Sequence, residues 1–180
     1  MFRYAVVRRP ARSLVSGLTS SPHLGAPDYE KALRQHDDYI RALEACGLSV
    51  TVLEALEQYP DSCFVEDTAF CLPDRAVLTN PGVPSRKGEV EDMECALRSF
   101  YAPDRIFRIR APGTLEGGDI LRAGEEVFVG LSNRTNQEGA IQFLNLLRDW
   151  GIPSQPVPVT GILHLKTGLS YLDGGRLLVS

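Results

Sequence analysis

The sequence contains no apolar run near the about 18 residues that a membrane-spanning helix needs, and no lysine and arginine cluster that could follow a phosphate backbone. Its formal net charge of −4 also argues against a nucleic-acid partner. Only three histidines are present, and none stands in a closely spaced pair of the kind that binds zinc. We therefore expect no membrane, no nucleic acid, no metal and no cofactor.

The four cysteines show no pattern typical of a disulfide framework or a zinc site. Cys46, Cys63, Cys71 and Cys95 have no CxxC spacing and no nearby histidine. Cys63 and Cys71 stand among phenylalanine and leucine, which predicts buried core thiols rather than nucleophiles. These features favour a reducing, cytoplasmic setting, and they leave the chain without an evident nucleophile.

The N-terminal segment combines four arginines with no acid before Asp28, a loose indication of a transit peptide. However, residues 2–7 alternate in polarity and Pro10 ends the alternation, which is more typical of a strand. Hydrophobic residues make up 43% of the 180 residues and charged ones 23%, as in an ordinary globular protein. We expect one domain over residues 1–180 with a substantial core.

Alternating strand and helix patterns predict an α/β fold. The long stretch between residues 8 and 27 is rich in serine, glycine and proline, and it is longer than a plain connector, so it could be functional. Asp28 is a suitable N-cap for the first helix, and Thr135 with Glu138 has the spacing of a capping box for the third. Helices are predicted at residues 28–46, 85–101 and 135–150, and strands at residues 1–7, 48–53, 76–78, 105–110, 126–130, 156–159 and 162–165, with a hairpin at residues 171–179.

Three acids stand beside apolar residues in the stretch from Asp61 to Phe70. Phe64, Val65 and Phe70 suit a sheet interior, yet Asp61, Glu66 and Asp67 accompany them. An ionised carboxylate costs several kcal/mol to bury without a partner. The stretch is therefore either a strand end open to solvent or a site that holds a cation.

The order of two strands, a helix and a further strand recurs with a period near 49 residues. Glu116 lies 49 residues after Asp67, and His164 lies 48 residues after Glu116. If each unit contributes the equivalent strand around a common axis, these three side chains converge. The chain is long enough for about 3.7 units of this size, which is not a whole number. Since a circular arrangement would need further residues to close, we expect a chain truncated at its C-terminus.

His164 stands between two leucines, so it is either a hydrogen-bonded core histidine or a general acid and base oriented by Glu116. Arg86 and Arg134 follow loops and precede helices, so each is either a solvated surface group or part of a fork for a substrate carboxylate. The combined prediction is a pocket with acids at one end and arginines at the other. Such a pocket suits a small zwitterion with a cationic tail.

Four segments, together with Ser16-Gly-Leu-Thr19 in the first loop, resemble the dimethylarginine dimethylaminohydrolase family, a member of the pentein group of guanidine-modifying enzymes. They are Phe64-Val-Glu-Asp67, Thr114-Leu-Glu-Gly-Gly-Asp119, Ser132-Asn-Arg-Thr135 and Leu163-His-Leu-Lys-Thr-Gly168. The likeness in layout runs over the whole chain. The Glu-Asp and Glu-Gly-Gly-Asp elements are similar to those of arginine and agmatine deiminases as well.

The resemblance implies a five-fold pseudo-symmetric α/β propeller of ββαβ units, of which this chain holds about three and a half. The implied reaction is hydrolysis of asymmetric dimethylarginine or monomethylarginine to citrulline and dimethylamine or methylamine. The implied substrate site has Glu66 and Asp67 holding the guanidinium, with Leu18 and Asp61 lining it. Family members often form homodimers, so a homodimer is the implied assembly.

The remaining implied roles concern the amino-acid end of the substrate and the proton transfers. Arg86 and Arg134 would bind the amino-acid end. His164 would protonate the leaving amine and then activate water, steered by Glu116. The family's nucleophile is a cysteine near the C-terminus, and no residue of this chain matches it. The resemblance therefore implies a truncated chain that is inactive by itself.

Three other functions stay open. The first is an arginine or agmatine deiminase, or an amidinotransferase, on the same fold. The second is a non-catalytic binder of arginine-like ligands. The third is a metal-dependent hydrolase that uses carboxylates and His164, which the small number of histidines makes the weakest. The candidate metal-binding residues are Asp61, Glu66, Asp67, Glu116, Asp119 and His164.

Overall fold

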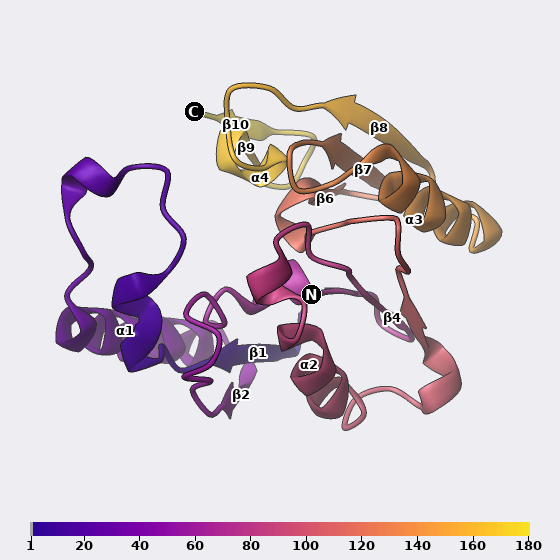
Figure 1. Cartoon of the computed structure of the whole chain (residues 1–180). Coiled ribbons are helices and arrows are strands. Elements are labelled where there is room, and N and C mark those ends of the chain that lie inside the picture. Colours follow the sequence, from indigo (N-terminus) through magenta and orange to yellow (C-terminus); the bar gives the residue numbers. More distant parts are fainter. Residues whose placement is uncertain (1) are drawn as a thin grey trace. The chain divides into compact units, whose positions relative to one another are not determined.

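The computed structural model describes residues 2–180, which divide into two compact units, residues 2–65 and 66–180. Each unit is described by itself (Figure 1). No helix among the described residues combines the length and the apolar character that crossing a bilayer requires.

The first unit is a single βαβ arrangement. Strand β1 (Tyr4–Arg8) pairs in parallel with β2 (Ser49–Leu53), and helix α1 (Tyr29–Ala45) connects them, as parallel strands require a long crossover. The predicted helix at residues 28–46 is confirmed with its cap, because the Asp28 side chain accepts a hydrogen bond from the Lys31 N–H. The predicted strand at residues 1–7 begins at Tyr4, and Met1 lies outside the described residues.

The long first loop is more ordered than an irregular stretch. It contains two short 3₁₀ turns, η1 (Arg12–Ser16) and η2 (Pro22–Leu24). The Glu57 carboxylate accepts hydrogen bonds from the first two backbone N–H groups of η1, at 2.9 and 3.0 Å. An acid at this position satisfies donors that the short turn leaves without partners.

The second unit repeats the order strand, strand, helix, strand. The first copy comprises η3 (Val65–Thr68), β3 (Ala69–Cys71), β4 (Ala76–Leu78), η4 (Pro84–Arg86), α2 (Glu89–Leu97), η5 (Pro103–Arg105) and β5 (Ile106–Arg108). The second copy comprises η6 (Gly117–Asp119), β6 (Ile120–Ala123), β7 (Glu126–Leu131), α3 (Gln137–Asp149) and β8 (Ser154–Pro158). A third beginning follows, with α4 (Leu165–Gly168), β9 (Leu169–Tyr171) and β10 (Leu177–Val179).

Strand pairing follows the same rule in each copy. The first two strands form an antiparallel hairpin, and the strand after the helix adds in parallel to the second, as β5 does to β4 and β8 to β7. Strands β9 and β10 form the hairpin of the third copy. The described residues thus make small sheets of two or three strands and no closed barrel.

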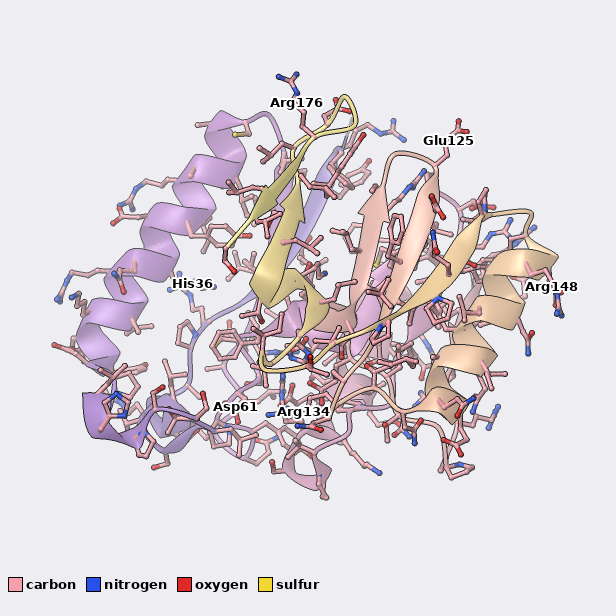
Figure 2. The ribbon with its side chains drawn as sticks, turned by 90° about the horizontal axis from the view of Figure 1, so that it is seen from above. His36, Asp61, Glu125, Arg134, Arg148 and Arg176 are labelled. Carbon is pink, nitrogen blue, oxygen red and sulfur yellow. The ribbon has the colours of Figure 1, made fainter. Side chains whose placement is uncertain are left out.

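The core of the second unit lies beneath α3. Val127 and Val129 alternate on β7 and are fully buried, as is Phe143 of α3. The Phe143 ring meets Phe70 edge to face, with centroids 5.2 Å apart. Figure 1 shows α3 beside β7 and β8, and in Figure 2 Arg148 points from its outer face away from the strands.

Two predicted elements are wrong in extent or type. The helix predicted at residues 85–101 is only the nine-residue α2, because a 3₁₀ turn at Pro84 precedes it and looser turns lead toward Pro103. The strand predicted at residues 162–165 is absent among the described residues. His164 is extended there only because it caps the short helix α4.

Three predictions about side chains are also wrong. Asn136, not Thr135, caps α3, with its side chain accepting a hydrogen bond from the Gly139 N–H at 2.8 Å. Cys71 is exposed and Cys63 half-buried, so neither is the deeply buried thiol expected. Phe64 is 55% exposed because β3 begins only at Ala69, after the turn η3.

Candidate active site

Each hairpin of the second unit is preceded by one short helical turn. Asp67 lies in η3, Glu116 directly precedes η6, and His164 directly precedes α4. The structure brings these three side chains together, with one potential ligand atom from each lying within 4.8 Å of the others. Residues about 49 apart in the chain therefore meet because they occupy the corresponding turn of successive copies.

His164 is buried, with acids on both sides of its ring. Its Nδ1 lies 3.3 Å from Asp119 Oδ2, whereas its Nε2 lies 3.4 Å from Glu116 Oε2 and 3.9 Å from Asp67 Oδ1. Burial by itself lowers the pKa of His164, but the hydrogen bond with Asp119 and the charges of the three carboxylates outweigh it. The pKa of His164 is therefore raised above its ordinary value.

Asp119 is the residue that sequence reasoning undervalued, since it appeared only in the metal-binding alternative. Its carboxylate is fully buried and accepts hydrogen bonds from the hydroxyls of Ser132 and Thr135, both at 2.7 Å, and from the Leu165 N–H at 3.0 Å. Burial raises the pKa of Asp119, and the hydrogen bonds from His164 and these donors lower it by more. The sequence did contain a signal for this site. Asp119 directly precedes one strand of a hairpin, and the hydroxyl residues Ser132 and Thr135 follow the other.

Arg86 lies among the acids instead of opposite them. Its guanidinium contacts Asp67 Oδ2 at 2.6 Å and forks onto Glu89 at 3.0 and 2.8 Å. All three residues are buried, and burial alone would lower the pKa of Arg86, but the hydrogen bonds and charges of Glu89 and Asp67 raise it. Glu89 gave no signal in the sequence beyond its position three residues after Arg86.

Arg134 repeats this arrangement on Glu116. It lies in the loop between β7 and α3 (Figure 2), and its Nη1 is 3.2 Å from Glu116 Oε2. The other oxygen of Glu116 accepts the Gly82 N–H at 3.0 Å. The expected separation of acids from arginines is therefore wrong in this structure, because buried carboxylates need cationic partners beside them.

Glu66 differs from its neighbour Asp67. Its side chain is 70% exposed and its carboxylate contacts Lys166 Nζ at 2.6 Å. The pair joins the turn η3 to the helix α4. Glu66 is adjacent in sequence to Asp67, and Lys166 follows His164 by two residues. Glu66 is thus a solvent-accessible acid whose cation comes from the chain itself.

Leu18 and Asp61 belong to the first unit and contact each other. The Leu18 N–H donates to both oxygens of the Asp61 carboxylate, at 3.0 and 3.3 Å. Asp61 is buried, whereas Leu18 is 51% exposed. The implied role of these two residues in lining a substrate site stays a prediction.

Gly118, in the Glu-Gly-Gly-Asp segment, lies where the structure has no room for a side chain. A Cβ at Gly118 would lie 2.6 Å from His164 Cδ2 and 3.0 Å from Asp67 Oδ1. Its N–H donates to that same Asp67 oxygen at 2.9 Å. The glycine lets the backbone of η6 approach the histidine and the acid at once.

The charges of the cluster favour a cationic ligand. With all four buried carboxylates (Asp67, Glu89, Glu116, Asp119) ionised, two guanidinium groups leave a net charge of −2, or −1 when His164 is protonated. Asp67, Glu116 and His164 have a spacing that a metal ion could use. However, one oxygen of Asp67 and both oxygens of Glu116 already contact guanidinium groups, and the other oxygen of Asp67 accepts the Gly118 N–H. The donor set therefore fits a planar organic cation better than a metal.

Comparison with known proteins gives concordant results. A family model described as "N,N dimethylarginine dimethylhydrolase, eukaryotic" matches residues 27–164. The N(G),N(G)-dimethylarginine dimethylaminohydrolase of Pseudomonas aeruginosa is 49% identical over 180 residues, which cover 100% of this chain and 70% of that protein. A solved structure from the same species, a cysteine-to-serine variant complexed with citrulline, has a TM-score of 0.96 at 50% identity, over 99% of this chain and 69% of that one.

A more distant structure shares the fold alone. The N-terminal domain of a cyanobacterial arginine dihydrolase has a TM-score of 0.83 at 17% identity, over 97% of this chain and 65% of that one. The chain thus has the α/β fold of these enzymes and spans about 70% of the length of its Pseudomonas relative. By the family match and the identity over its whole length, the chain belongs to the dimethylarginine dimethylaminohydrolase family, a family of hydrolases.

Proposed function

We propose that this chain supplies the substrate-binding and proton-transfer residues for the hydrolysis of asymmetric dimethylarginine and monomethylarginine to citrulline and dimethylamine or methylamine. The observation that carries the proposal is His164, buried between Asp119 on one ring nitrogen and Glu116 with Asp67 on the other. Such a histidine can hold and return a proton beside a cationic ligand. The family membership and the citrulline complex of the Pseudomonas relative support the same substrate class.

We propose that Asp67 and Glu66 bind the substrate guanidinium. Asp67 already accepts a hydrogen bond from the guanidinium group of Arg86 at 2.6 Å, and this contact supports its proposed role. Glu66 would exchange Lys166 for the substrate, since an exposed ion pair costs little to separate. Arg86 and Arg134 would bind the amino-acid end of the substrate. Each guanidinium group would then contact the substrate carboxylate as well as its present partner, Asp67 or Glu116.

The proposed reaction proceeds through a covalent intermediate. A thiolate adds to the guanidinium carbon, and His164 gives its proton to the departing amine nitrogen as the carbon–nitrogen bond breaks. The neutral His164 then takes a proton from water, whose oxygen adds to the same carbon, and the carbon–sulfur bond breaks. The remaining hydroxyl proton passes to the free amine. The products are therefore citrulline and the protonated amine, the thiolate and protonated His164 are restored, and one water is consumed per substrate.

The nucleophilic thiol is not evident among the cysteines of this chain. Cys46, Cys71 and Cys95 are exposed and Cys63 is half-buried in the first unit. Cys71 and Cys95 belong to the second unit, and neither is among the described contacts of His164, Glu116 or Asp67. We propose that these 180 residues do not supply the nucleophile and that by themselves they release no citrulline.

The remaining parts of the proposal concern the assembly. The repeated ββαβ order supports a five-bladed propeller in which residues 1–180 form one catalytic-type domain of about three and a half units. Cytoplasmic location and homodimer formation stay predictions from the sequence.

A deiminase acting on arginine or agmatine is the alternative, favoured by the fold likeness to an arginine dihydrolase. A non-catalytic binder of arginine-like ligands is the second alternative. We expect the full-length protein to release citrulline from asymmetric dimethylarginine faster than from arginine, and none from agmatine. Faster release from arginine would select the deiminase, and binding without any release would select the binder.

A further inference from the structure

The position of one proton in the buried cluster follows from its hydrogen bonds. An ionised carboxylate can only accept, and a hydroxyl has a single hydrogen to donate. Thr135 Oγ1 already accepts the Glu116 N–H at 3.2 Å, so its hydrogen is free to point at Asp119 Oδ2, 2.7 Å away. The Thr135 hydroxyl therefore acts as a donor to Asp119.

Ser132 leads to the same conclusion. Its Oγ accepts the N–H groups of Arg134 and Thr135, at 3.0 and 3.2 Å, and its hydrogen points at Asp119 Oδ2 at 2.7 Å. The second oxygen of Asp119 accepts the Leu165 N–H. Both oxygens of the carboxylate are thus fixed as acceptors.

The imidazole must match this arrangement. Since Asp119 Oδ2 has no hydrogen to give, His164 Nδ1 at 3.3 Å must carry the hydrogen and donate it. In the neutral ring this leaves the lone pair on Nε2, which faces Glu116 and Asp67. Which nitrogen is basic is decided by the partner of the other nitrogen.

We propose that Asp119 is a positioning residue that holds His164 in the Nδ1–H tautomer, so that Nε2 is the nitrogen that takes up and releases the proton. The proposal rests on the proposed function only for the use of that proton. It assigns to Glu116 a different task from the predicted steering, because Glu116 faces the exchanging nitrogen. Glu116 and Asp67 then stabilise the added proton on Nε2.

The backbone around the ring supports a single ring orientation. Gly118 lies against one edge of His164, with room for no Cβ, as described above. Gly130 lies equally close to Asp119, since a Cβ at Gly130 would be 2.9 Å from Asp119 Oδ1. The charged groups that face the ring or its partners are Asp67, Glu116, Asp119, Arg86 and Arg134.

Nitrogen NMR of histidine-labelled protein tests the proposal without any assay of activity. Only three histidines contribute signals, so His164 can be assigned by substitution, and His23 and His36 serve as internal references. We expect neutral His164 to show a protonated Nδ1 and an unprotonated Nε2. A wild-type protein in which neutral His164 carries its hydrogen on Nε2 overturns the proposal, whether or not any variant folds.

Three variants separate Asp119 from its neighbours. In Asp119→Asn the amide would donate to Nδ1, so we expect His164 to change to the Nε2–H tautomer and to titrate at lower pH. Glu116→Gln should also lower the titration but keep the Nδ1–H tautomer. Ser132→Ala, which removes one donor and keeps the carboxylate, should leave the tautomer unchanged.

An unaltered tautomer in folded Asp119→Asn would show that Asp119 has only a structural role. Failure of the proposed function has a different signature, because the protein would then release no citrulline from methylated arginine whatever the tautomer of His164. The two outcomes are measured independently.

Discussion

The guanidinium of Arg86 lies 2.6 Å from the carboxylate of Asp67, and the two side chains are only 4% and 12% exposed. This pair, completed by Glu89 on the other side of the guanidinium, places a buried cation directly beside the acid proposed to bind substrate. Buried charges of this kind contribute little as a pair but are costly to leave single.

Removing Arg86 should therefore destabilise the fold strongly. We expect Arg86→Ala to lower the free energy of unfolding in urea by about 3–5 kcal/mol, because it leaves two buried carboxylates without their cation. Arg98→Ala is the matched control and should cost at most about 1 kcal/mol, because Arg98 is exposed and its partner Glu94 keeps a second cation, Arg108. Equal effects of the two substitutions would contradict the burial of the Arg86 cluster.

The raised pKa of His164 predicts a pH dependence of stability with a definite sign. Folding favours the protonated ring, so its contribution is complete below the ordinary histidine pKa of 6.5 and is lost as the pH rises through the folded pKa. Urea unfolding should show the wild type losing its advantage over His164→Gln across that range. A difference independent of pH would refute the assignment.

His36 provides a control of opposite sign. Its pKa is lowered, chiefly by burial and further by Arg9, so folding favours the neutral ring. The wild type should therefore gain stability relative to His36→Gln as the pH rises toward and past 6.5. The two histidine variants should diverge in the same series of urea titrations.

Gly118 should tolerate no side chain. In Gly118→Ala the new methyl would lie 2.6 Å from the His164 ring, so we expect a loss of about 1–3 kcal/mol in the free energy of unfolding and a displaced His164 signal. Gly168→Ala is the matched control, because its Cβ would meet only the flexible end of Ile162. A folded, unshifted Gly118→Ala protein would show that the turn η6 has more room than the structure indicates.

The exposed acid Glu66 should matter for ligand and not for stability. We expect Glu66→Gln to weaken binding of asymmetric dimethylarginine by the full-length protein about tenfold or more, measured by calorimetry, because a charged hydrogen bond is lost. Its free energy of unfolding should change by at most about 1 kcal/mol, since the Lys166 pair is exposed. Glu125→Gln, at the β6–β7 turn (Figure 2), should change neither quantity.

Local sequence signals were reliable where the structure depends on neighbours in the chain. Asp28 caps α1 as its spacing indicated, and the alternation around Val127 and Val129 became a core strand. They failed at Thr135, whose hydroxyl fits a capping box equally well but donates to Asp119 instead. A short polar side chain has several possible partners, and only the fold determines which one is near.

The sequence by itself determined the family and the repeated order of strands and helices. It also predicted that Asp67, Glu116 and His164 converge. Only the tertiary structure decided that Asp119 contacts the histidine and that both arginines pair with the acids they were expected to oppose. Spacing along a chain shows which residues occupy equivalent positions in successive repeats. It does not show which oxygen faces which nitrogen, because that depends on how three turns far apart in sequence pack and on the need of each buried charge for a partner.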